Sequence, residues 1–337
     1  MSKKRKSNIE LLRIISMMLV LLCHYVPTRE NGMHNGVNAL NENLLGTIIN
    51  LELRSLSIVC THCFILISGY FGIKFKIKSL ANLLFQMLFW CIVCIIIAAL
   101  LAGDLSPVPS IKTFITSIVY GWFPCGYIIL FIVSPILNSF INSCSEKELG
   151  KYIIYFYLLS TIGGYILGFT DFNAGMSALS MCGLYLIGAY LRSSKLKIFT
   201  LKARGDLLMY IGLGVLMVVI NLVLLYFKIY SSPYGYLNPI VIAMSIYLFL
   251  YFLKIDIGSN KIINFFSASA FSIYLFHCNI YTGDYISQIW KDINIHFGIL
   301  SSILMGLLSF ITIYLFCTLI DQTRISIYKK IISKFQQ

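Results

Sequence analysis

The sequence contains few charged residues for its length. Asp, Glu, Lys and Arg make up 12% of the 337 residues, whereas hydrophobic residues make up 58%. A soluble protein of this size carries about 25% charged residues, so a soluble globular fold is excluded. No soluble domain, domain-length linker or convincing internal repeat is visible. The sequence therefore predicts a polytopic membrane protein in which residues 1–337 form one all-α domain.

Long apolar segments account for most of the chain. A membrane-spanning helix needs about 20 apolar residues, and ten segments approach this length. Several end at turn signals, such as Pro107 and Pro109 or Ser143–Ser145. We expect a bundle of about ten transmembrane helices. The predicted spans are residues 9–28, 51–72, 80–102, 126–143, 152–169, 176–192, 207–227, 237–254, 263–282 and 298–320.

Acidic residues are scarce, with 13 against 26 Lys and Arg, which gives a net charge of +13. Such an excess can indicate nucleic-acid binding, but the positions of the basic residues indicate topology instead. With both termini in the cytoplasm, inner segments hold 20 Lys and Arg, Arg324 among them, and outer loops hold four; Arg13 and Arg54 lie within or at the edge of spans. We therefore expect a multi-pass protein of the cell (plasma or inner) membrane, embedded in the lipid bilayer, with no nucleic-acid partner. The four outer residues are Arg29, Lys112, Lys228 and Lys291.

The N-terminus partly resembles a signal peptide, because Lys3–Lys6 precede an apolar stretch. No small-residue cleavage site follows, however, and Arg13 interrupts the apolar run. We therefore expect a first helix that is retained in the membrane.

The ten cysteines include two pairs with zinc-like spacing, Cys60-x-x-Cys63 and Cys91-x-x-Cys94. Both pairs lie in apolar runs, where residues three apart simply share one face of a helix. Buried cysteine commonly behaves as a small apolar side chain. We therefore expect no metal site.

The longest outer loop lies between the third and fourth predicted spans. Apolar residues recur at helical spacing from Ile111 to Val119, and Trp122 follows. This pattern predicts a short helix in the outer membrane interface. The helix would either anchor the protein or roof an outward-facing site.

Arg13 and His24 are ionisable residues inside the first predicted span. They are 11 positions apart, which corresponds to roughly 20° beyond three full helical turns and to a rise of about 16 Å. Both side chains therefore lie on one stripe of the helix. Because ionisable groups inside a membrane are costly, they indicate function. We interpret this stripe as a catalytic conduit across the bilayer.

The two side chains suit different tasks. A neutral imidazole can take a proton from an attacking hydroxyl, which is the role expected of His24. The guanidinium of Arg13 suits a phosphate or an anionic carrier group. An ion pair with Glu10 is the structural alternative, and the two roles are compatible because Glu10 would hold Arg13 in place.

The remaining four histidines give weaker signals. His34 and His296 lie in outer loops, where ordinary solvated histidines are expected. His62 lies near the middle of the second span and His277 near the outer end of the ninth. Structural hydrogen bonding is an alternative to catalysis for both.

The second span ends in Phe64–Gly72, and Lys74, Lys76 and Lys78 follow. One interpretation is a small-residue packing site followed by positive-inside lysines. The other is a cytoplasmic site for a phosphate-rich ligand. In that case the binding residues are Ser68, Tyr70, Lys74, Lys76 and Lys78.

Three smaller groups are candidates for binding or orienting an acceptor, and each also has a structural interpretation. Trp122 and Tyr127 lie at the start of the fourth span. Tyr274 and His277 share a face of the ninth span and could border the same cavity. Glu52 and Arg54 lie at the outer mouth of the second span, where a carboxylate could orient His24.

Together these residues resemble acyltransferase family 3, a family of integral membrane acyltransferases. The segment Asn8–His24 follows the family's first helix: an acidic residue three before an Arg, then ten residues, then His. Phe64–Phe71 resembles its phenylalanine-rich Ser-Gly-Tyr stretch and Trp122–Pro135 its Trp-to-Pro region. Ile273–His277 resembles its late Tyr-x-x-His segment. The likeness covers nearly the whole chain, with the motifs in the family's order.

The resemblance implies transfer of an acyl group, commonly acetyl, from cytoplasmic acyl-CoA (acetyl-CoA) to a sugar hydroxyl of an extracytoplasmic or lipid-linked glycan, the usual setting being polysaccharide O-acetylation. It also implies that Arg13 and His24 are essential. Many members carry two arginines three apart after the second span, where this chain has Lys74, Lys76 and Lys78. We expect no extracytoplasmic esterase-like domain after the membrane part, so any second step would need a separate protein.

We expect the coenzyme phosphates near Arg13 and the Lys74–Lys78 rim, with the pantetheine arm along the stripe. His24 would act as general base or carry the acyl group itself, and the sequence leaves both open. The alternative function is a transporter or exporter of a sugar, amino acid or polysaccharide. Against it, no paired interrupted helices indicate an inverted repeat, and intramembrane acids are scarce. A structural envelope subunit would explain neither Arg13 nor His24, and the oligomeric state stays open.

Overall fold

The computed structural model describes residues 6–26, 43–104, 109–196, 199–229 and 233–334. Helices dominate these residues and no strand occurs among them, which confirms the all-α prediction. The predicted helix end at Thr28, the loop residue His34 and the Lys3–Arg5 part of the basic N-terminus lie outside these ranges.

Backbone contacts divide the chain into two compact units. Unit 1 comprises Met1–Lys74 and Ile129–Asn260, and unit 2 comprises Phe75–Ile128 and Lys261–Gln337. The expectation that residues 1–337 act as one domain stays a prediction beside this division.

Six helical stretches in the described part of the chain are long and apolar enough to cross a membrane. They are Ser7–Tyr25, Leu44–Phe71, Ile77–Ala102, Trp122–Ser143, Ala203–Tyr226 and Ile299–Ile331. The protein is therefore a membrane protein with several spans, whereas the number ten and the cytoplasmic termini stay predictions.

Two of the other predicted spans form helices of 16 residues, α9 (Ala178–Ser193) and α11 (Pro239–Lys254). Such helices measure about 24 Å, less than the roughly 30 Å of a hydrocarbon core. The predicted spans 152–169 and 263–282 each comprise two helical elements. The first divides into α8 (Glu146–Leu159) and the π-helix η1 (Ser160–Ile166), the second into α12 (Lys261–Ser267) and α13 (Ala270–His277).

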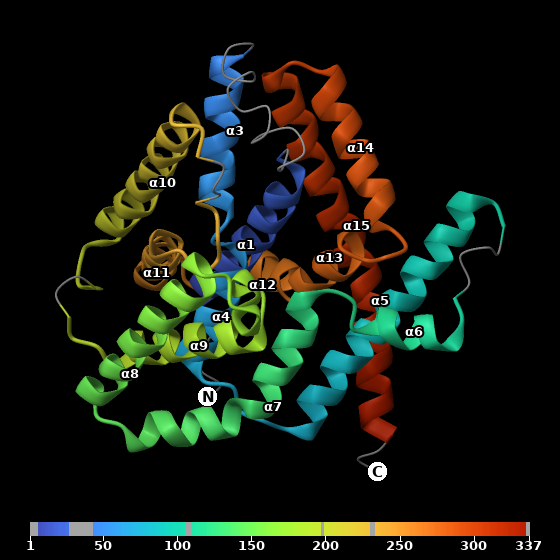
Figure 1. The fold of residues 1–337 in the computed structure, drawn as a ribbon. Coiled ribbons are helices and arrows are strands. Elements are labelled where there is room, and N and C mark those ends of the chain that lie inside the picture. Colours follow the sequence, from blue (N-terminus) through green and yellow to red (C-terminus); the bar gives the residue numbers. More distant parts are fainter. Residues whose placement is uncertain (1–5, 27–42, 105–108, 197–198, 230–232, 335–337) are drawn as a thin grey trace. The chain divides into compact units, whose positions relative to one another are not determined.

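Unit 1 is built around the first two predicted spans. Helix α1 (Ser7–Tyr25) packs against α3 (Leu44–Ser57), α4 (Cys60–Phe71) and α11. Helix α10 (Ala203–Tyr226) packs against α3 and α11. The unit also contains α8, α9, η1, the C-terminal part of α7 and the short 3-10 helix η2 (Thr170–Gly175), and Figure 1 labels its larger helices.

Helices α4 and α9 cross at glycines. A Cβ on Gly69 would stand 2.1 Å from the Tyr185 carbonyl oxygen, and one on Gly188 would stand 2.5 Å from the Leu66 carbonyl oxygen. Such close backbone approach is typical of small-residue helix packing in membranes. The Ser-Gly stretch of the second predicted span is therefore a packing site, as one of its two interpretations proposed.

The start of α1 is tied to the segment that follows α11. The Asn8 side-chain amide donates to the Phe252 carbonyl at 2.9 Å, which satisfies a C-terminal carbonyl of α11. The Ser7 amide donates to the Gly258 carbonyl at 2.9 Å. The Asn260 amide in turn donates to the Ser7 hydroxyl at 2.8 Å. These contacts hold the N-terminal end of α1, and Arg13 lies about one and a half turns further along the helix.

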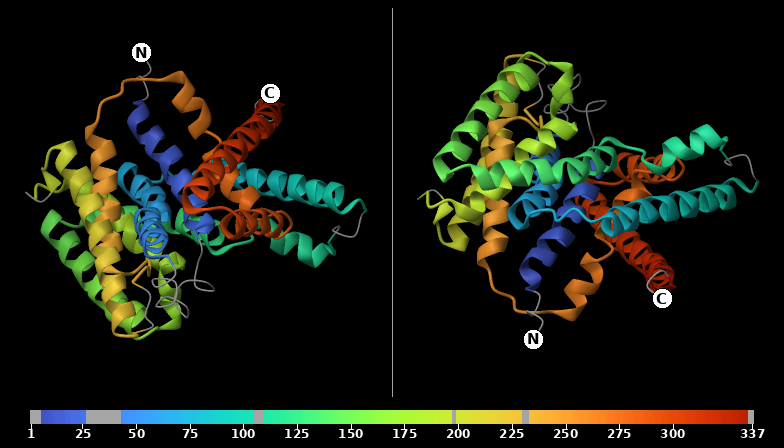
Figure 2. Two further views of the ribbon diagram at one scale, coloured as in Figure 1. Left: turned by 90° about the horizontal axis from the view of Figure 1, so that it is seen from above. Right: turned by 90° about the horizontal axis from the view of Figure 1, so that it is seen from below.

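Unit 2 contains α5 (Ile77–Ala102), α6 (Ile111–Ile118), the beginning of α7 (Trp122–Ser143), α12, α13, α14 (Gly283–His296) and α15 (Ile299–Lys334). Helix α13 packs against α5, α14 and α15. Helices α14 and α15 lie side by side in both views of Figure 2, in orange to red.

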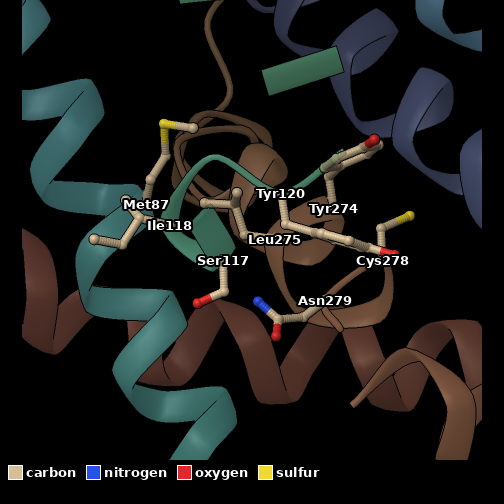
Figure 3. Close-up of a pocket in the computed structure, with 8 residues that line it drawn as sticks. All are labelled: Met87, Ser117, Ile118, Tyr120, Tyr274, Leu275, Cys278 and Asn279. Carbon is tan, nitrogen blue, oxygen red and sulfur yellow. The ribbon is translucent and has the colours of Figure 1, made fainter. Parts of the chain in front are cut away.

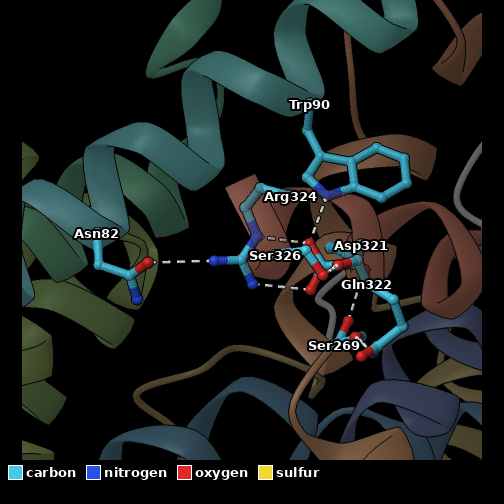
Figure 4. A network of polar contacts seen from close by, with 8 residues as sticks. Asn82, Trp90, Ser269, Asp321, Gln322, Arg324 and Ser326 are labelled. Atoms are coloured by element: carbon cyan, nitrogen blue, oxygen red, sulfur yellow. Dashed lines mark hydrogen bonds and ion pairs between the residues drawn. The ribbon is translucent and has the colours of Figure 1, made fainter. Parts of the chain in front are cut away.

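A buried ion pair within α15 is hydrogen-bonded to α5 (Figure 4). Arg324 and Asp321 are 4% and 0% exposed, and the guanidinium donates to both carboxylate oxygens at 2.8 Å. The Trp90 indole donates to Asp321 at 3.0 Å, and Arg324 donates to the Asn82 amide oxygen at 3.1 Å. Arg324 was counted above as a topology charge, but its charge is neutralised inside the helix packing. The pair connects helices rather than marking a solvated loop.

The predicted interfacial helix is observed as α6. Ile111 and Ile115 are 81% and 60% exposed, whereas Ser117 is buried and lies 3.3 Å from the Cys91 sulfur of α5. Phe114 and Ile118 are half-buried, so only part of the apolar face of α6 is exposed. The short helix is confirmed, and its location in the membrane interface stays a prediction.

The paired cysteines are buried, as expected. Cys60, Cys63, Cys91 and Cys94 are each at most 1% exposed. They behave as small packing residues of α4 and α5. The expectation that the chain binds no metal stays a prediction.

Candidate functional site

Arg13 and His24 lie on one uninterrupted helix. Helix α1 runs from Ser7 to Tyr25 and contains both residues. At 100° and 1.5 Å per residue they fall on one stripe, about 16 Å apart along the axis. The predicted helical register is confirmed.

The stripe between these two residues is filled by apolar side chains. Met17 and Val20 occupy the intervening positions on the same face, and each is only 2% exposed. In this conformation, therefore, no open groove follows α1 from Arg13 to His24, which differs from the predicted conduit. A ligand arm would have to displace these side chains or approach His24 along another path.

The two ends of the stripe differ in their surroundings. Arg13 is half-buried, and its Nε is a buried atom without a hydrogen-bond partner in the described part of the structure. His24 is exposed in the last turn of α1. An unpaired buried guanidinium nitrogen is uncommon and retains the capacity to bind an anion. The Glu10–Arg13 ion pair stays a prediction.

Arg54 holds the helix end that carries His24. Its Nη1 donates to the Cys23 carbonyl oxygen and lies 3.0 Å from the Cys23 sulfur. The carbonyl is one of those that α1 leaves without an intrahelical partner at its C-terminus. A guanidinium from α3 thus fixes the backbone directly beside His24. The predicted orienting role of Arg54 fits this contact and stays a prediction.

Glu52 occupies the other side of α3. It is two positions before Arg54, and this separation places the two side chains about 200° apart around the helix axis. Its Oε1 lies against Gly214 of α10, 3.4 Å from where a Cβ would stand. The predicted role of Glu52 in orienting His24 therefore gains no support from this placement, and stays a prediction.

His62 lies inside the helix packing near the start of α4. The side chain is 3% exposed, and its ring centre is 5.6 Å from that of Tyr236. Its Nδ1 has no hydrogen-bond partner in the described part of the structure. With this burial, His62 is a packing residue of unit 1 in this conformation.

The end of α4 packs tightly and leads to an exposed basic segment. The Ser68 hydroxyl donates to the Phe64 carbonyl of its own helix at 2.9 Å. The Tyr70 ring lies 5.3 Å from that of Phe249. Lys74, Lys76 and Lys78 are all exposed. The lysines are therefore accessible to an anionic ligand, whereas Ser68 and Tyr70 contribute to packing.

Two side chains hold the residue before Lys74. The Tyr185 hydroxyl accepts from the Ile73 amide at 2.8 Å and donates to the Asn138 Oδ1 at 2.7 Å. The Asn138 amide nitrogen donates to the Ile73 carbonyl at 2.8 Å. The amide and the carbonyl of Ile73 are thus hydrogen-bonded to Tyr185 and Asn138, and these two side chains are hydrogen-bonded to each other.

The aromatic candidates of unit 2 form one cluster. The Phe123 ring is stacked on Tyr127 at 6.1 Å and lies 5.6 Å from both Trp122 and Tyr274. The Tyr274 hydroxyl would be 3.1 Å from a Cβ on Gly121, whose φ is +95°. Glycine is suited to this position by both its conformation and the close approach. The two predicted aromatic groups are therefore brought together.

His277 is part of the same cluster but is bonded within its own segment. Its ring centre lies 5.9 Å from that of Tyr274. Its Nδ1 is 2.6 Å from the Ile273 carbonyl oxygen, and its Nε2 is 3.2 Å from the Cys278 sulfur. At 4% exposed, His277 fits the structural interpretation better than the catalytic one.

A small pocket adjoins this cluster (Figure 3). Its polar lining comes from Ser117, Tyr120, Tyr274, Cys278 and Asn279. The cavity volume of about 10 Å³ accommodates roughly one water-sized group. Ser117 belongs to α6, and Tyr120 lies two residues after its end. The predicted interfacial helix and the residues just after it therefore form one wall of this pocket. Ile118 of α6 also lines the pocket, whereas Ile111 and Ile115 are exposed.

The family comparison accounts for the order of these segments. A family model described as an acyltransferase domain, that of acyltransferase family 3, matches residues 6–321. The chain belongs to acyltransferase family 3. It matches no curated protein and no solved structure.

For this family 3 acyltransferase, the structure adds contacts that the sequence did not indicate. The bond from Arg54 to Cys23 joins residues 31 positions apart, and the ring around Ile73 joins three separate segments. No sequence signal identifies such pairs, because both depend on how helices cross. The nearest hints were the polar residues Asn138 and Arg54 inside otherwise apolar stretches.

Proposed function

We propose that this family 3 acyltransferase moves an acyl group, commonly acetyl, from cytoplasmic acyl-CoA to a sugar hydroxyl of an extracytoplasmic or lipid-linked glycan. The observation that supports this proposal most is the unbroken helix α1, which presents Arg13 and His24 on one stripe within a chain matched over residues 6–321 by the family. The proposal includes a plasma or inner membrane location with both termini in the cytoplasm.

His24 is the proposed proton acceptor. Its imidazole removes the proton from the sugar hydroxyl as the oxygen attacks the thioester carbonyl carbon. The carbon–sulfur bond then breaks, and the departing coenzyme thiolate takes the proton back from His24. In a second version His24 attacks the thioester carbonyl carbon and displaces the coenzyme thiolate. The sugar oxygen then attacks the acyl-imidazole, which releases His24, and the hydroxyl proton passes to the thiolate. The exposure of His24 at the end of α1 suits either step.

Arg13 and the exposed lysines are the proposed donor-binding groups. Guanidinium and ammonium groups bind phosphate oxygens through charge-assisted hydrogen bonds. Such donors are the exposed Lys74, Lys76 and Lys78 and the Arg13 Nε, which has no hydrogen-bond partner among the described residues. Because Met17 and Val20 fill the stripe, donor binding requires these two side chains to move or the arm to take another path.

Trp122, Tyr127 and Tyr274 are the proposed acceptor-binding residues. Aromatic faces with polar edges suit the alternating apolar and hydroxyl surfaces of a sugar. The adjoining pocket admits only one small group in this conformation. We propose that it receives a single hydroxyl of the acceptor.

The test replaces His24 in cells that lack the native gene. Variants His24→Ala and His296→Ala are expressed, and ester groups on the purified surface polysaccharide are measured by proton NMR. A general base contributes about 10²–10⁴-fold, so His24→Ala should abolish detectable esters. His296→Ala is the matched control, because His296 is exposed on α14 and bonded to the Asp292 backbone. Undiminished esterification by a folded His24→Ala protein would refute the mechanism.

A second assay, with purified protein, tests the transporter hypothesis. Proteoliposomes containing the purified chain are loaded with the glycan fraction and supplied with acetyl-CoA. Release of free coenzyme that depends on the glycan supports transfer. Glycan counterflow without coenzyme release would support transport instead.

A further inference from the structure

The segment that carries Lys74 is held by side chains from two other helices. Helix α4 ends at Phe71, and Gly72 follows with a φ of +74°. This left-handed conformation, which glycine adopts readily, turns the chain out of the helix. Ile73 is buried at 8% exposed, and Lys74 is exposed. The boundary between packed core and accessible lysine therefore lies within two residues.

The hydrogen bonds at Ile73 form a closed ring. The Ile73 amide donates to the Tyr185 hydroxyl at 2.8 Å, and this hydroxyl donates to Asn138 Oδ1 at 2.7 Å. Asn138 completes the ring by donating to the Ile73 carbonyl at 2.8 Å. The ring fixes both peptide planes that flank Ile73, and the carbonyl belongs to the same peptide unit as the Lys74 nitrogen. The backbone of Lys74 is thereby oriented.

Other contacts between α9 and the end of α4 make the ring rigid. The Tyr185 carbonyl lies against Gly69, where even a methyl group would not fit. Arg192, two turns further along α9, reaches the Tyr70 carbonyl at 3.4 Å. Tyr185 itself is completely buried. Its hydroxyl therefore has one position available, and the two bonds it makes are set by the crossing of the helices.

We infer that Asn138 and Tyr185 are positioning residues for donor recognition. They hold Lys74 at the orientation in which it meets the phosphates of the acyl donor, and they take no part in the chemical step. This inference rests on the proposed function, in which the lysines after α4 bind those phosphates. It predicts that breaking the hydrogen-bonded ring raises the KM for acetyl-CoA and leaves kcat unchanged.

The experiment measures kinetics of the purified full-length protein in lipid nanodiscs, with the glycan fraction from cells lacking the gene as acceptor. Two donors are compared: acetyl-CoA, and S-acetyl-N-acetylcysteamine, which keeps the thioester but lacks every phosphate. For Tyr185→Phe we expect the KM for acetyl-CoA to rise about 5- to 30-fold with kcat unchanged. The KM for the phosphate-free donor should stay at the wild-type value. A merely structural defect would affect both donors alike and would overturn the inference.

Two further variants make the result specific. Lys74→Ala should raise the acetyl-CoA KM, and combining it with Tyr185→Phe should add little, because both act through one contact. Tyr190→Phe is the matched control: Tyr190 is on the same helix and packs against Gly150, away from Ile73. Wild-type acetyl-CoA KM in either Lys74→Ala or Tyr185→Phe would overturn the inference.

The outcomes separate this inference from the proposed function. If Tyr185→Phe does not fold, Asn138→Asp replaces it, since Asp keeps the acceptor for Tyr185 and loses the donor to Ile73. Asn138→Asp should also raise only the acetyl-CoA KM, and an unchanged KM would refute the positioning role. A wild-type protein without acetyl-CoA turnover would refute the proposed function itself, whereas turnover with donor-independent defects refutes the inference alone.

Discussion

Arg54→Met tests whether the end of α1 must be held for His24 to act. The substitution keeps an unbranched, flexible side chain and removes the guanidinium. It therefore deletes the bond to the Cys23 carbonyl and the 3.0 Å contact to the Cys23 sulfur. The carbonyl is left without this partner at the helix end, and the last turn of α1 becomes free to move.

The magnitude follows from the type of bond. A hydrogen bond from a charged group contributes about 1.5–3 kcal/mol, which would correspond to about 10- to 150-fold in rate if all of it held His24 in place. Because Arg54 is half-buried, we expect the lower part of this range, a decrease in kcat of about 10- to 30-fold. Arg54→Lys keeps the charge but not the planar donor group, so its kcat should be intermediate.

The assay is acetyl-CoA turnover by purified protein in nanodiscs, with thermal unfolding measured on the same samples. The KM for acetyl-CoA should not change, since Arg54 acts beside His24. Ser55→Ala is the control: Ser55 is the next residue of α3, and its hydroxyl lies 3.4 Å from that of Tyr234. An unchanged kcat in a folded Arg54→Met protein, or an equal loss in Ser55→Ala, would refute the reasoning.

Two other predictions concern stability, and thermal unfolding in detergent micelles measures both. Arg324→Met leaves the Asp321 carboxylate buried without its cation and should lower the free energy of unfolding by about 3–5 kcal/mol. Adding Asp321→Leu should restore most of this loss. For the exposed control Arg204→Met, the free energy of unfolding should stay within about 0.5 kcal/mol of the wild-type value. Gly188→Ala places a methyl group 2.5 Å from a backbone carbonyl and should cost about 1–3 kcal/mol. Gly212→Ala on α10 meets nothing within 4 Å and should be neutral or stabilising. Equal stability of the glycine variants, or of the arginine variants, would contradict the packing described.

The sequence predicted those features that depend on neighbouring residues along the chain. The register of Arg13 and His24 follows from helical geometry alone, and α1 confirms it. The short helix α6 was predicted because its apolar residues recur at helical spacing. The family was identified because its motifs are continuous stretches of sequence.

Other predictions were incomplete because they needed the neighbours of each helix. The predicted conduit along α1 assumed that a polar stripe faces open space, but the packing of Met17 and Val20 fills it. Arg324 was assigned to topology because a count of charges does not reveal burial. The ion pair is surrounded by residues far away in the sequence: Asn82 is 242 positions from Arg324, and Trp90 is 231 positions from Asp321.

The sequence by itself determined that the chain is a helical membrane protein of acyltransferase family 3, and which helix carries the paired Arg13 and His24. Apolar length and helical periodicity are local properties, so they can be read without knowing any contact. Only the tertiary structure decided that Arg54 bonds to Cys23 and that Tyr185 and Asn138 bond to the backbone of Ile73. Those contacts depend on where helices cross, and the crossing points are set by the packing of all their side chains together.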